Sequence, residues 1–148
     1  MSEVAILKNV IDELNVRGIK VIFLELDKHG YCVPQRNIII INQNLNETDQ
    51  LKVLFHELGH FNHIDYIELY KHTIYHSKME NEAECYAIQS LLEHHMLIND
   101  LEPGRVNYIN FLESYNLDLK YAYVVKRILK DKITGRNSLF TKQSICFY

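Results

Sequence analysis

The sequence lacks a long apolar run, an excess of positive charge and the cysteine pattern of a secreted domain. No stretch approaches the roughly 18 apolar residues that a membrane-spanning helix needs, so we expect no membrane span. With 16 Lys and Arg against 19 Asp and Glu, the net charge of −3 argues against a protein that binds nucleic acid directly through a basic surface. Three scattered cysteines, an odd number, are not typical of a disulfide framework.

The chain also lacks a recognisable secretory signal and internal boundaries. Residues 1–6 contain neither a basic segment nor an uninterrupted apolar stretch, so the cytoplasm is the expected location. We find no repeat, low-complexity segment or linker, and 148 residues are typical of one domain. We therefore predict a single domain over residues 1–148, in which residues 130–148, with weak periodicity, form an arm or a loose tail.

The sequence does contain a short β-rich region followed by helical patterns, which predicts an α+β fold. Apolar residues alternate with helical or strand periods along most of the chain. The predicted helices cover residues 3–15, 46–61, 77–98, 103–115 and 117–130, and the predicted strands cover residues 21–26, 31–33 and 37–42. The last strand is apolar on both faces, which predicts that it is buried.

The most specific pattern is the run His56-Glu57-Leu58-Gly59-His60. Four residues along an α-helix advance about 6 Å, so both imidazoles leave the same face one turn apart. This arrangement suits two nitrogen ligands of one tetrahedral Zn²⁺. Glu57 leaves the helix at another angle, where it can act as general base without occupying a coordination position. The alternative is a chance meeting of two imidazoles in a chain with eight histidines.

The segment around this run has good helix signals. Asn46 offers an N-cap, with Asp49 three residues further on. An apolar stripe follows at three- and four-residue steps: Leu51, Leu54, Phe55, Leu58 and Phe61. Gly59 costs about 1 kcal/mol of helix propensity relative to alanine. That cost is explained if another backbone passes close, although a plain packing role would give the same sequence.

A third ligand is predicted on the next helix. Glu80 lies 20 residues beyond His60, on the first turn of the predicted helix 77–98, and Glu84 lies one turn further on the same face. A carboxylate at that second position could orient a histidine ligand. Alternatively, Ser77 and Glu80 form only a capping box. Glu82 is a weaker candidate because it points about 200° away around the helix axis, and the other His and acidic residues stay open.

Two other zinc schemes can be compared with the spacing. The metzincin pattern requires His at position 66 and Gly at position 63, where this chain has Tyr66 and His63, so it is excluded. A deformylase-like scheme would use an upstream cysteine such as Cys32, but the residues around it do not match that family's segment. A single cysteine is more often a small buried hydrophobe, so Cys32 stays a minor alternative.

Taken together, the motifs resemble those of the ImmA/IrrE family of metallopeptidases. That family shows an I-I-x-I-N strand, then H-E-L-G-H, then E-x-E-A-N-x-F-A. The corresponding segments here are residues 38–42, 56–60 and 80–87, within a resemblance that covers residues 5–98. Two positions depart from the pattern: Glu84 replaces the usual Asn, and Tyr86 replaces Phe.

The resemblance implies a zincin-like fold, with a small N-terminal β-sheet and an active-site helix packed among several helices. It implies that His56, His60 and Glu80 bind Zn²⁺, that Glu57 is the catalytic acid/base, and that Glu84 adds negative charge beside the site. It further implies a zinc endopeptidase of a phage or mobile element that cleaves or inactivates a partner, a helix-turn-helix transcriptional repressor.

Two alternatives to an enzyme remain open. A non-proteolytic anti-repressor module could keep the zinc site for structure, and a purely structural helical protein would bind no metal. The presence of Glu57 argues against the binding module, because such a module has no structural need for that carboxylate. Spacing does not choose the residue that stabilises the oxyanion among Tyr66, His63, His72, His76, His94, His95 and several tyrosines. An edge strand beside the motif helix would suit an extended peptide, and residues 131–148 could cover the cleft.

Overall fold

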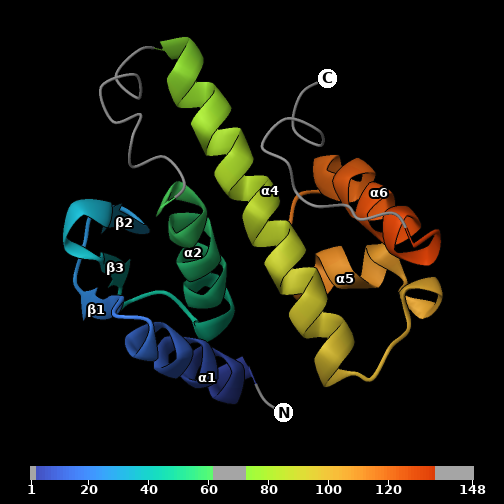
Figure 1. Cartoon of the computed structure of the whole chain (residues 1–148), viewed down its shortest axis with the longest axis horizontal. Coiled ribbons are helices and arrows are strands. Elements are labelled where there is room, and N and C mark those ends of the chain that lie inside the picture. The colour runs from blue at the N-terminus through green and yellow to red at the C-terminus, as the bar shows by residue number, and fades with distance from the viewer. Residues whose placement is uncertain (1–2, 62–72, 136–148) are drawn as a thin grey trace. The chain divides into compact units, whose positions relative to one another are not determined.

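The computed structural model describes residues 3–61 and 73–135, which form an α+β fold, as predicted (Figure 1). The described helices are α1 (Glu3–Val16), α2 (Glu47–His60), α4 (Thr73–Ile98), α5 (Tyr108–Ser114) and α6 (Ala122–Ile133). The strands are β1 (Lys20–Leu24), β2 (Gly30–Val33) and β3 (Ile38–Asn42), and short 3-10 helices cover Pro34–Arg36, Pro103–Arg105 and Leu119–Tyr121. The chain forms two compact units, Met1–Ala87 and Ile88–Tyr148, with the boundary inside α4. The single-domain expectation stays a prediction.

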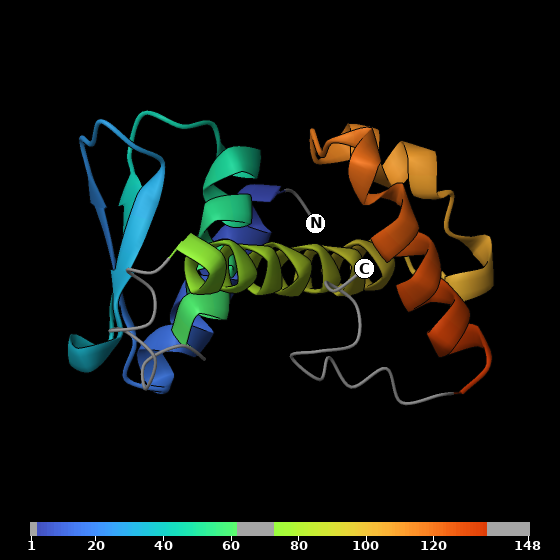
Figure 2. The ribbon, with the colours of Figure 1, turned by 90° about the horizontal axis from the view of Figure 1, so that it is seen from above.

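The first unit is built on a three-stranded sheet with β3 in the centre. β1 pairs with β3 in parallel and β2 pairs with it antiparallel. Ile39, Ile40 and Ile41 of β3 are all buried, which confirms the prediction from their apolar pattern. Figure 2 shows α1 and α2 on the same face of this sheet. The central strand is therefore the core around which the motif helix is fixed.

Helix α2 begins and packs as its sequence predicts. The backbone N–H of Asp49 donates to Oδ1 of Asn46 at 2.8 Å, which confirms the N-cap. The apolar stripe is buried at Leu51, Leu54, Phe55 and Leu58.

Gly59 marks the place where α2 meets α4. A Cβ added at Gly59 would lie 2.8 Å from Cα of Ala83 and 3.1 Å from its carbonyl oxygen. Side chains do not approach a backbone at 2.8 Å, so only glycine permits this crossing. Of the two explanations that the sequence left open for this glycine, the structure supports the close backbone approach, which brings α2 and α4 together at Ala83.

Helix α4 begins earlier than predicted. It starts at Thr73 rather than Ser77, because no glycine or proline interrupts residues 73–76. Ser77 is therefore inside the helix, and Glu80 lies beyond the first turn instead of within it. The capping-box alternative for Glu80 is wrong, since the amides of an N-terminal turn are not available at that position.

In the second unit the predicted starts of two helices are also wrong. Pro103–Arg105 forms only a 3-10 helix, and α5 begins at Tyr108, because the side chain of Asn107 accepts from the backbone N–H of Ile109 and of Asn110. Likewise Asp118 accepts from the N–H of Lys120, and α6 begins at Ala122 rather than Leu117. The side chains of asparagine and aspartate accept hydrogen bonds from these backbone amides, so each of them moves the start of its helix further along the chain.

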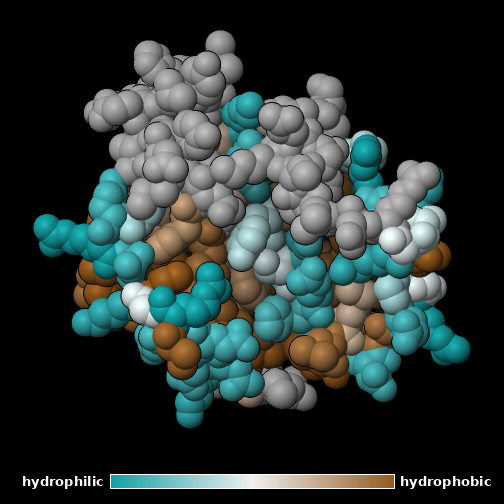
Figure 3. All heavy atoms as spheres, viewed as in Figure 1, coloured by the Kyte–Doolittle hydropathy of each residue, from teal (hydrophilic) through white to brown (hydrophobic). Residues whose placement is uncertain are grey.

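The described surface mixes polar and apolar side chains, as the face in Figure 3 shows. The large exposed hydrophobic residues are spread over different elements: Val16, Leu24, Leu97, Leu119, Tyr123 and Ile133. None of the helices within residues 3–61 and 73–135 is both long and apolar enough to cross a membrane.

Candidate metal centre

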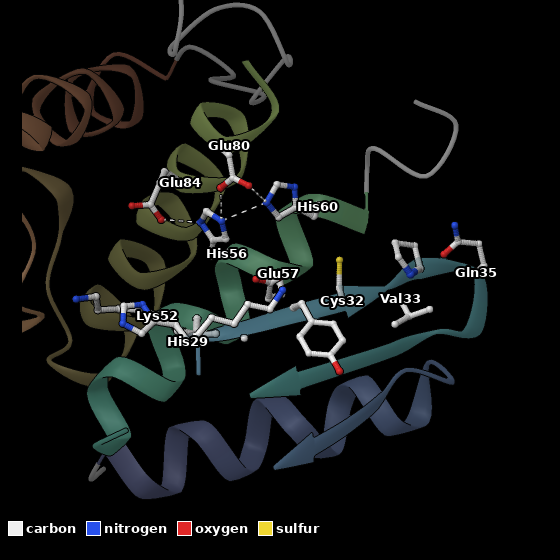
Figure 4. A pocket seen from close by; sticks show the side chains of 15 residues that line it. His29, Cys32, Val33, Gln35, Lys52, His56, Glu57, His60, Glu80 and Glu84 are labelled. Atoms are coloured by element: carbon white, nitrogen blue, oxygen red, sulfur yellow. Dashed lines mark hydrogen bonds and ion pairs between the residues drawn. The ribbon is translucent and has the colours of Figure 1, made fainter. Parts of the chain in front are cut away.

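Three side chains from two helices converge at one point in the first unit (Figure 4). Nε2 of His56 lies 3.2 Å from Nε2 of His60 and 2.9 Å from one carboxylate oxygen of Glu80. Nε2 of His60 lies 3.1 Å from the other carboxylate oxygen of Glu80. In the part of the chain that the structure describes, these residues form the group of ligand atoms that could hold a metal ion, all within 4.8 Å of one another. Glu82 and Cys32, the alternatives from the sequence, are outside this group.

The spacing of these atoms fits a small divalent ion. Ligands held about 2.0–2.1 Å from a tetrahedral Zn²⁺ are separated from each other by about 3.3 Å. The separations of 2.9–3.2 Å between the two imidazole nitrogens and the Glu80 oxygens are close to that value. One carboxylate and two neutral imidazoles are also a donor set that zinc accepts. The residues present therefore fit the ion that the sequence predicts.

The charge around the centre favours a cation. Burial alone would lower the pKa of His56, but its hydrogen bonds to Glu80 and Glu84 and the charges of both carboxylates outweigh burial and raise that pKa to about 10. The same field that stabilises a proton on the imidazole would stabilise a metal ion between the two helices.

Glu84 contacts the far side of the His56 ring. Its Oε1 lies 2.7 Å from Nδ1 of His56, while Nε2 of the same ring faces Glu80 and His60. A carboxylate on Nδ1 fixes the tautomer and the direction of an imidazole, so that Nε2 keeps its lone pair for a ligand. The placement follows from the helix, because Glu80 and Glu84 are one turn apart on α4 and both reach the same ring.

Glu57 is positioned beside this centre without being part of it. It is only 8% exposed, and with His60 it is one of two buried polar residues in the described ranges. Burial raises the pKa of the Glu57 carboxyl, against the lowering effect of the charges of His60 and His56. A buried carboxylate with a raised pKa is suited to accept and release a proton at neutral pH.

The centre opens into a cavity of about 840 Å³ within the first unit. One wall is formed by residues 28–35, which include β2, an edge strand of the sheet. The opposite wall is formed by α2 and α4: Lys52, Val53, His56, Glu57, His60, Glu80 and Glu84. An exposed strand edge beside a reactive centre can hold an extended peptide by backbone hydrogen bonds.

The structure places one residue at the cavity whose position there the sequence interpretation missed. Cys32 of β2, considered from the sequence as a minor metal-ligand alternative or a small buried hydrophobe, lines the same cavity as Glu57. The alternation of side chains along the strand could have indicated this position, because a small residue on the helix-facing side of a strand lies where the motif helix packs.

The structure does not choose an oxyanion-stabilising residue. Tyr66, His63 and His72 fall outside the described residues. His76 is exposed on α4 and does not line the cavity. His94 and His95 belong to the second unit. Residues 136–148, most of the segment expected to cover the cleft, also fall outside the described ranges.

A helix that presents two imidazoles and a carboxylate outside the ligand group, together with a candidate carboxylate ligand on a second helix, all beside one cavity, is typical of metallopeptidases. The chain belongs to the Peptidase M78 family: the family model, described as IrrE N-terminal-like domain, matches residues 14–121. The resemblance to the ImmA/IrrE family is thereby confirmed. Comparison with curated proteins and with solved structures gives no match.

Proposed function

We propose that the protein is a zinc-dependent endopeptidase. The observation that carries this proposal is the convergence of His56, His60 and Glu80 beside the buried carboxylate of Glu57, at the wall of one cavity. His56, His60 and Glu80 would hold the ion. When bound, Zn²⁺ supplies a Lewis acid that polarises the scissile carbonyl and lowers the pKa of a water molecule towards 7.

Each of the chain's own residues has a distinct task in this reaction. Glu57 takes the proton from the attacking water and passes it to the leaving amine. Its burial favours this shuttle, because a desolvated carboxylate binds a proton more readily than an exposed one. Glu84 holds Nδ1 of His56, so that the ring does not rotate away from the centre.

The substrate strand is expected to lie along β2. Gly30–Val33 pairs with β3 on one side, which leaves its other side as the edge of the sheet. An extended segment bonded to that edge would pass in front of Glu57 and the candidate ligands, which line the same cavity. Backbone pairing of this kind selects an unfolded or exposed loop rather than a folded surface.

The protein substrate that we propose is a transcriptional repressor of the helix-turn-helix class, encoded on a phage or mobile element. The support for this part is the family to which the chain belongs. Cleavage of such a repressor would release the genes that it silences.

The test compares the wild-type protein with Glu57→Gln, a substitution that keeps shape and removes the proton acceptor. Both zinc-loaded proteins are incubated with a lysate of the source cells, and newly formed N-termini are labelled and sequenced. New termini within a helix-turn-helix regulator, formed by the wild type alone, support the proposal. If both proteins capture the same regulator and neither cleaves it, the protein is the non-proteolytic binding module instead.

A further inference from the structure

The wall of the cavity contains an acidic part and a basic part. The acidic part belongs to the candidate metal centre and consists of Glu57, Glu80 and Glu84. The basic part, which we call the basic end, consists of Lys28, His29 and Lys52. A substrate that enters this cavity therefore meets two lysine side chains as well as the metal centre.

Asn42 of β3 fixes the turn that carries two residues of the basic end. Its Nδ2 donates to the carbonyl oxygens of Leu26 and Lys28, at 3.2 Å each. Its backbone N–H donates to the carbonyl oxygen of His29 at 2.8 Å. Three hydrogen bonds from one residue hold the backbone of this turn on the central strand. Lys28 and His29 therefore reach the cavity from a fixed position, although their side chains are exposed.

The turn contributes positive charge to the cavity. Nζ of Lys28 lies 4.4 Å from the centre of the Tyr31 ring, which also lines the cavity. An aromatic face attracts a cation, so this contact favours a position of the ammonium group over the cavity wall. The acidic residues of the same turn, Glu25 and Asp27, do not line the cavity.

Lys52 adds a second ammonium group from α2. Its Nζ lies 3.4 Å from Oδ1 of Asp49, one turn earlier on the helix, and Asp49 does not line the cavity. An ammonium group has three N–H donors, so one can bind Asp49 while another binds a carboxylate in the cavity. A Cβ added at Gly30 would lie 2.6 Å from Cγ1 of Val53, the residue after Lys52. This turn of α2 therefore packs against the start of β2, directly after Lys28 and His29.

The basic end lies about two substrate residues from the metal centre. Lys52 and Val53 come four residues before His56 and Glu57, about 6 Å along α2. Two residues of an extended peptide span about 6.6 Å, and their side chains point to the same side. In Figure 4, Lys52 lies towards the opposite end of the cavity from Gln35. A substrate strand along β2, with its scissile bond at Glu57, would thus bring the side chain two residues away to the basic end.

We propose that the basic end is a specificity subsite, in which Lys28 and Lys52 bind an aspartate or glutamate two residues from the bond that is cleaved. The proposal rests on the endopeptidase function above. The competing explanation is that the lysines only keep the rim of the cavity hydrated. The two explanations differ in one respect, because only a subsite distinguishes a substrate glutamate from glutamine, which has the same shape and no charge.

The first test measures binding and needs no cleavage. Two fluorescein-labelled pools of short peptides carry either Glu or Gln at the central position and only Ala, Ser, Val and Leu elsewhere. Each pool is titrated with the zinc-loaded full chain carrying Glu57→Gln, and binding is measured by fluorescence anisotropy. We expect the Glu pool to bind about fivefold more tightly, as ion pairs at partly exposed sites allow. Adding Lys28→Gln and Lys52→Gln together should reduce this preference to less than about twofold.

The matched control adds Lys8→Gln and Lys20→Gln to the same Glu57→Gln protein. These lysines are exposed in the first unit and do not line the cavity, so the control removes the same charge from another surface. It should keep the preference for the Glu pool. Equal binding of the two pools before any lysine is replaced, or an equal loss of preference in both double-lysine variants, overturns the proposal.

The second test measures cleavage by the zinc-loaded wild type, with a library of proteome-derived peptides as the probe and mass spectrometry to identify the cleaved bonds. Asp and Glu should be enriched about fivefold at the second residue on one side of those bonds, and Lys28→Gln with Lys52→Gln should remove the enrichment. Cleavage without this enrichment overturns the subsite and leaves the endopeptidase function in place. A wild type that cleaves no peptide counts against the endopeptidase function, and the peptide pools then decide whether the basic end binds a carboxylate.

Discussion

Replacing Gly59 by alanine tests whether the crossing of α2 and α4 sets the geometry of the metal centre. The new Cβ would lie 2.8 Å from Cα of Ala83, and ordinary contact begins at 3.4 Å. The two helices must therefore separate by roughly 0.6 Å, since both contacting atoms are close to the backbone and neither can rotate away. Metal–ligand distances tolerate only about 0.2 Å of change.

The expected effect on stability is small, whereas the effect on metal binding is large. Overpacking costs about 1–3 kcal/mol, and the better helix propensity of alanine offsets about 1 kcal/mol of that. We therefore expect the zinc-free protein to lose about 0–2 kcal/mol of unfolding free energy. Zinc affinity should fall by about tenfold or more, because Glu80 moves with α4 away from His56 and His60.

The assay is competition for zinc with a chromogenic chelator, run beside urea unfolding of the zinc-free protein. Gly104→Ala is the matched control, since a Cβ at Gly104 meets nothing within 4 Å; it should bind zinc like the wild type. The reasoning would be refuted if Gly59→Ala bound zinc as tightly as the wild type and gained the full helix propensity of alanine, about 1 kcal/mol of unfolding free energy.

Two further predictions concern the third ligand and the second unit. Glu80→Ala should lose bound zinc, measured by mass spectrometry of metal content, whereas Glu82→Ala should keep it; equal loss in both would reject Glu80 as the ligand. Burial lowers the pKa of His95, whose ring packs on those of Phe111 and Tyr115, so the unfolded chain binds the proton more readily than the folded one. The contribution of His95 to stability is therefore fully present above its ordinary pKa of 6.5. That contribution declines as the pH falls through 6.5 towards the lower pKa of the folded state. Urea unfolding at pH 7 and pH 5 should show a smaller decline in His95→Gln than in the wild type.

The sequence predicts that His56 and His60 lie together, because these residues are local to one helix. His56, Glu57 and His60 lie within one helical turn and a half, so helical periodicity alone sets their directions. The buried strand β3 was likewise predictable from a run of β-branched residues. Glu80 was found from its spacing, although its place within α4 was not, because the start of that helix carries no strong local signal.

What the sequence does not predict depends on contacts between distant segments. The packing of β2 on α2, which brings Cys32 and Glu57 to the same cavity, depends on the fit of Val53 over Gly30. Similarly, the late starts of α5 and α6 depend on whether Asn107 and Asp118 cap the backbone or point elsewhere. Both kinds of choice are decided by packing and local competition, which periodicity does not describe.

The division of the candidate ligands between α2 and α4 has a consequence for how long the protein survives in the cell before it is degraded. An ion held by His56, His60 and Glu80 would act as a removable cross-link between two parts of the chain 20 residues apart. Binding free energy would then be part of folding free energy, about 1.4 kcal/mol for each tenfold increase in free zinc above the dissociation constant. The unfolded fraction, and with it the rate of degradation by cellular proteases, would rise as free zinc falls. Metal starvation would then lead to degradation of the protein before its chemistry stopped.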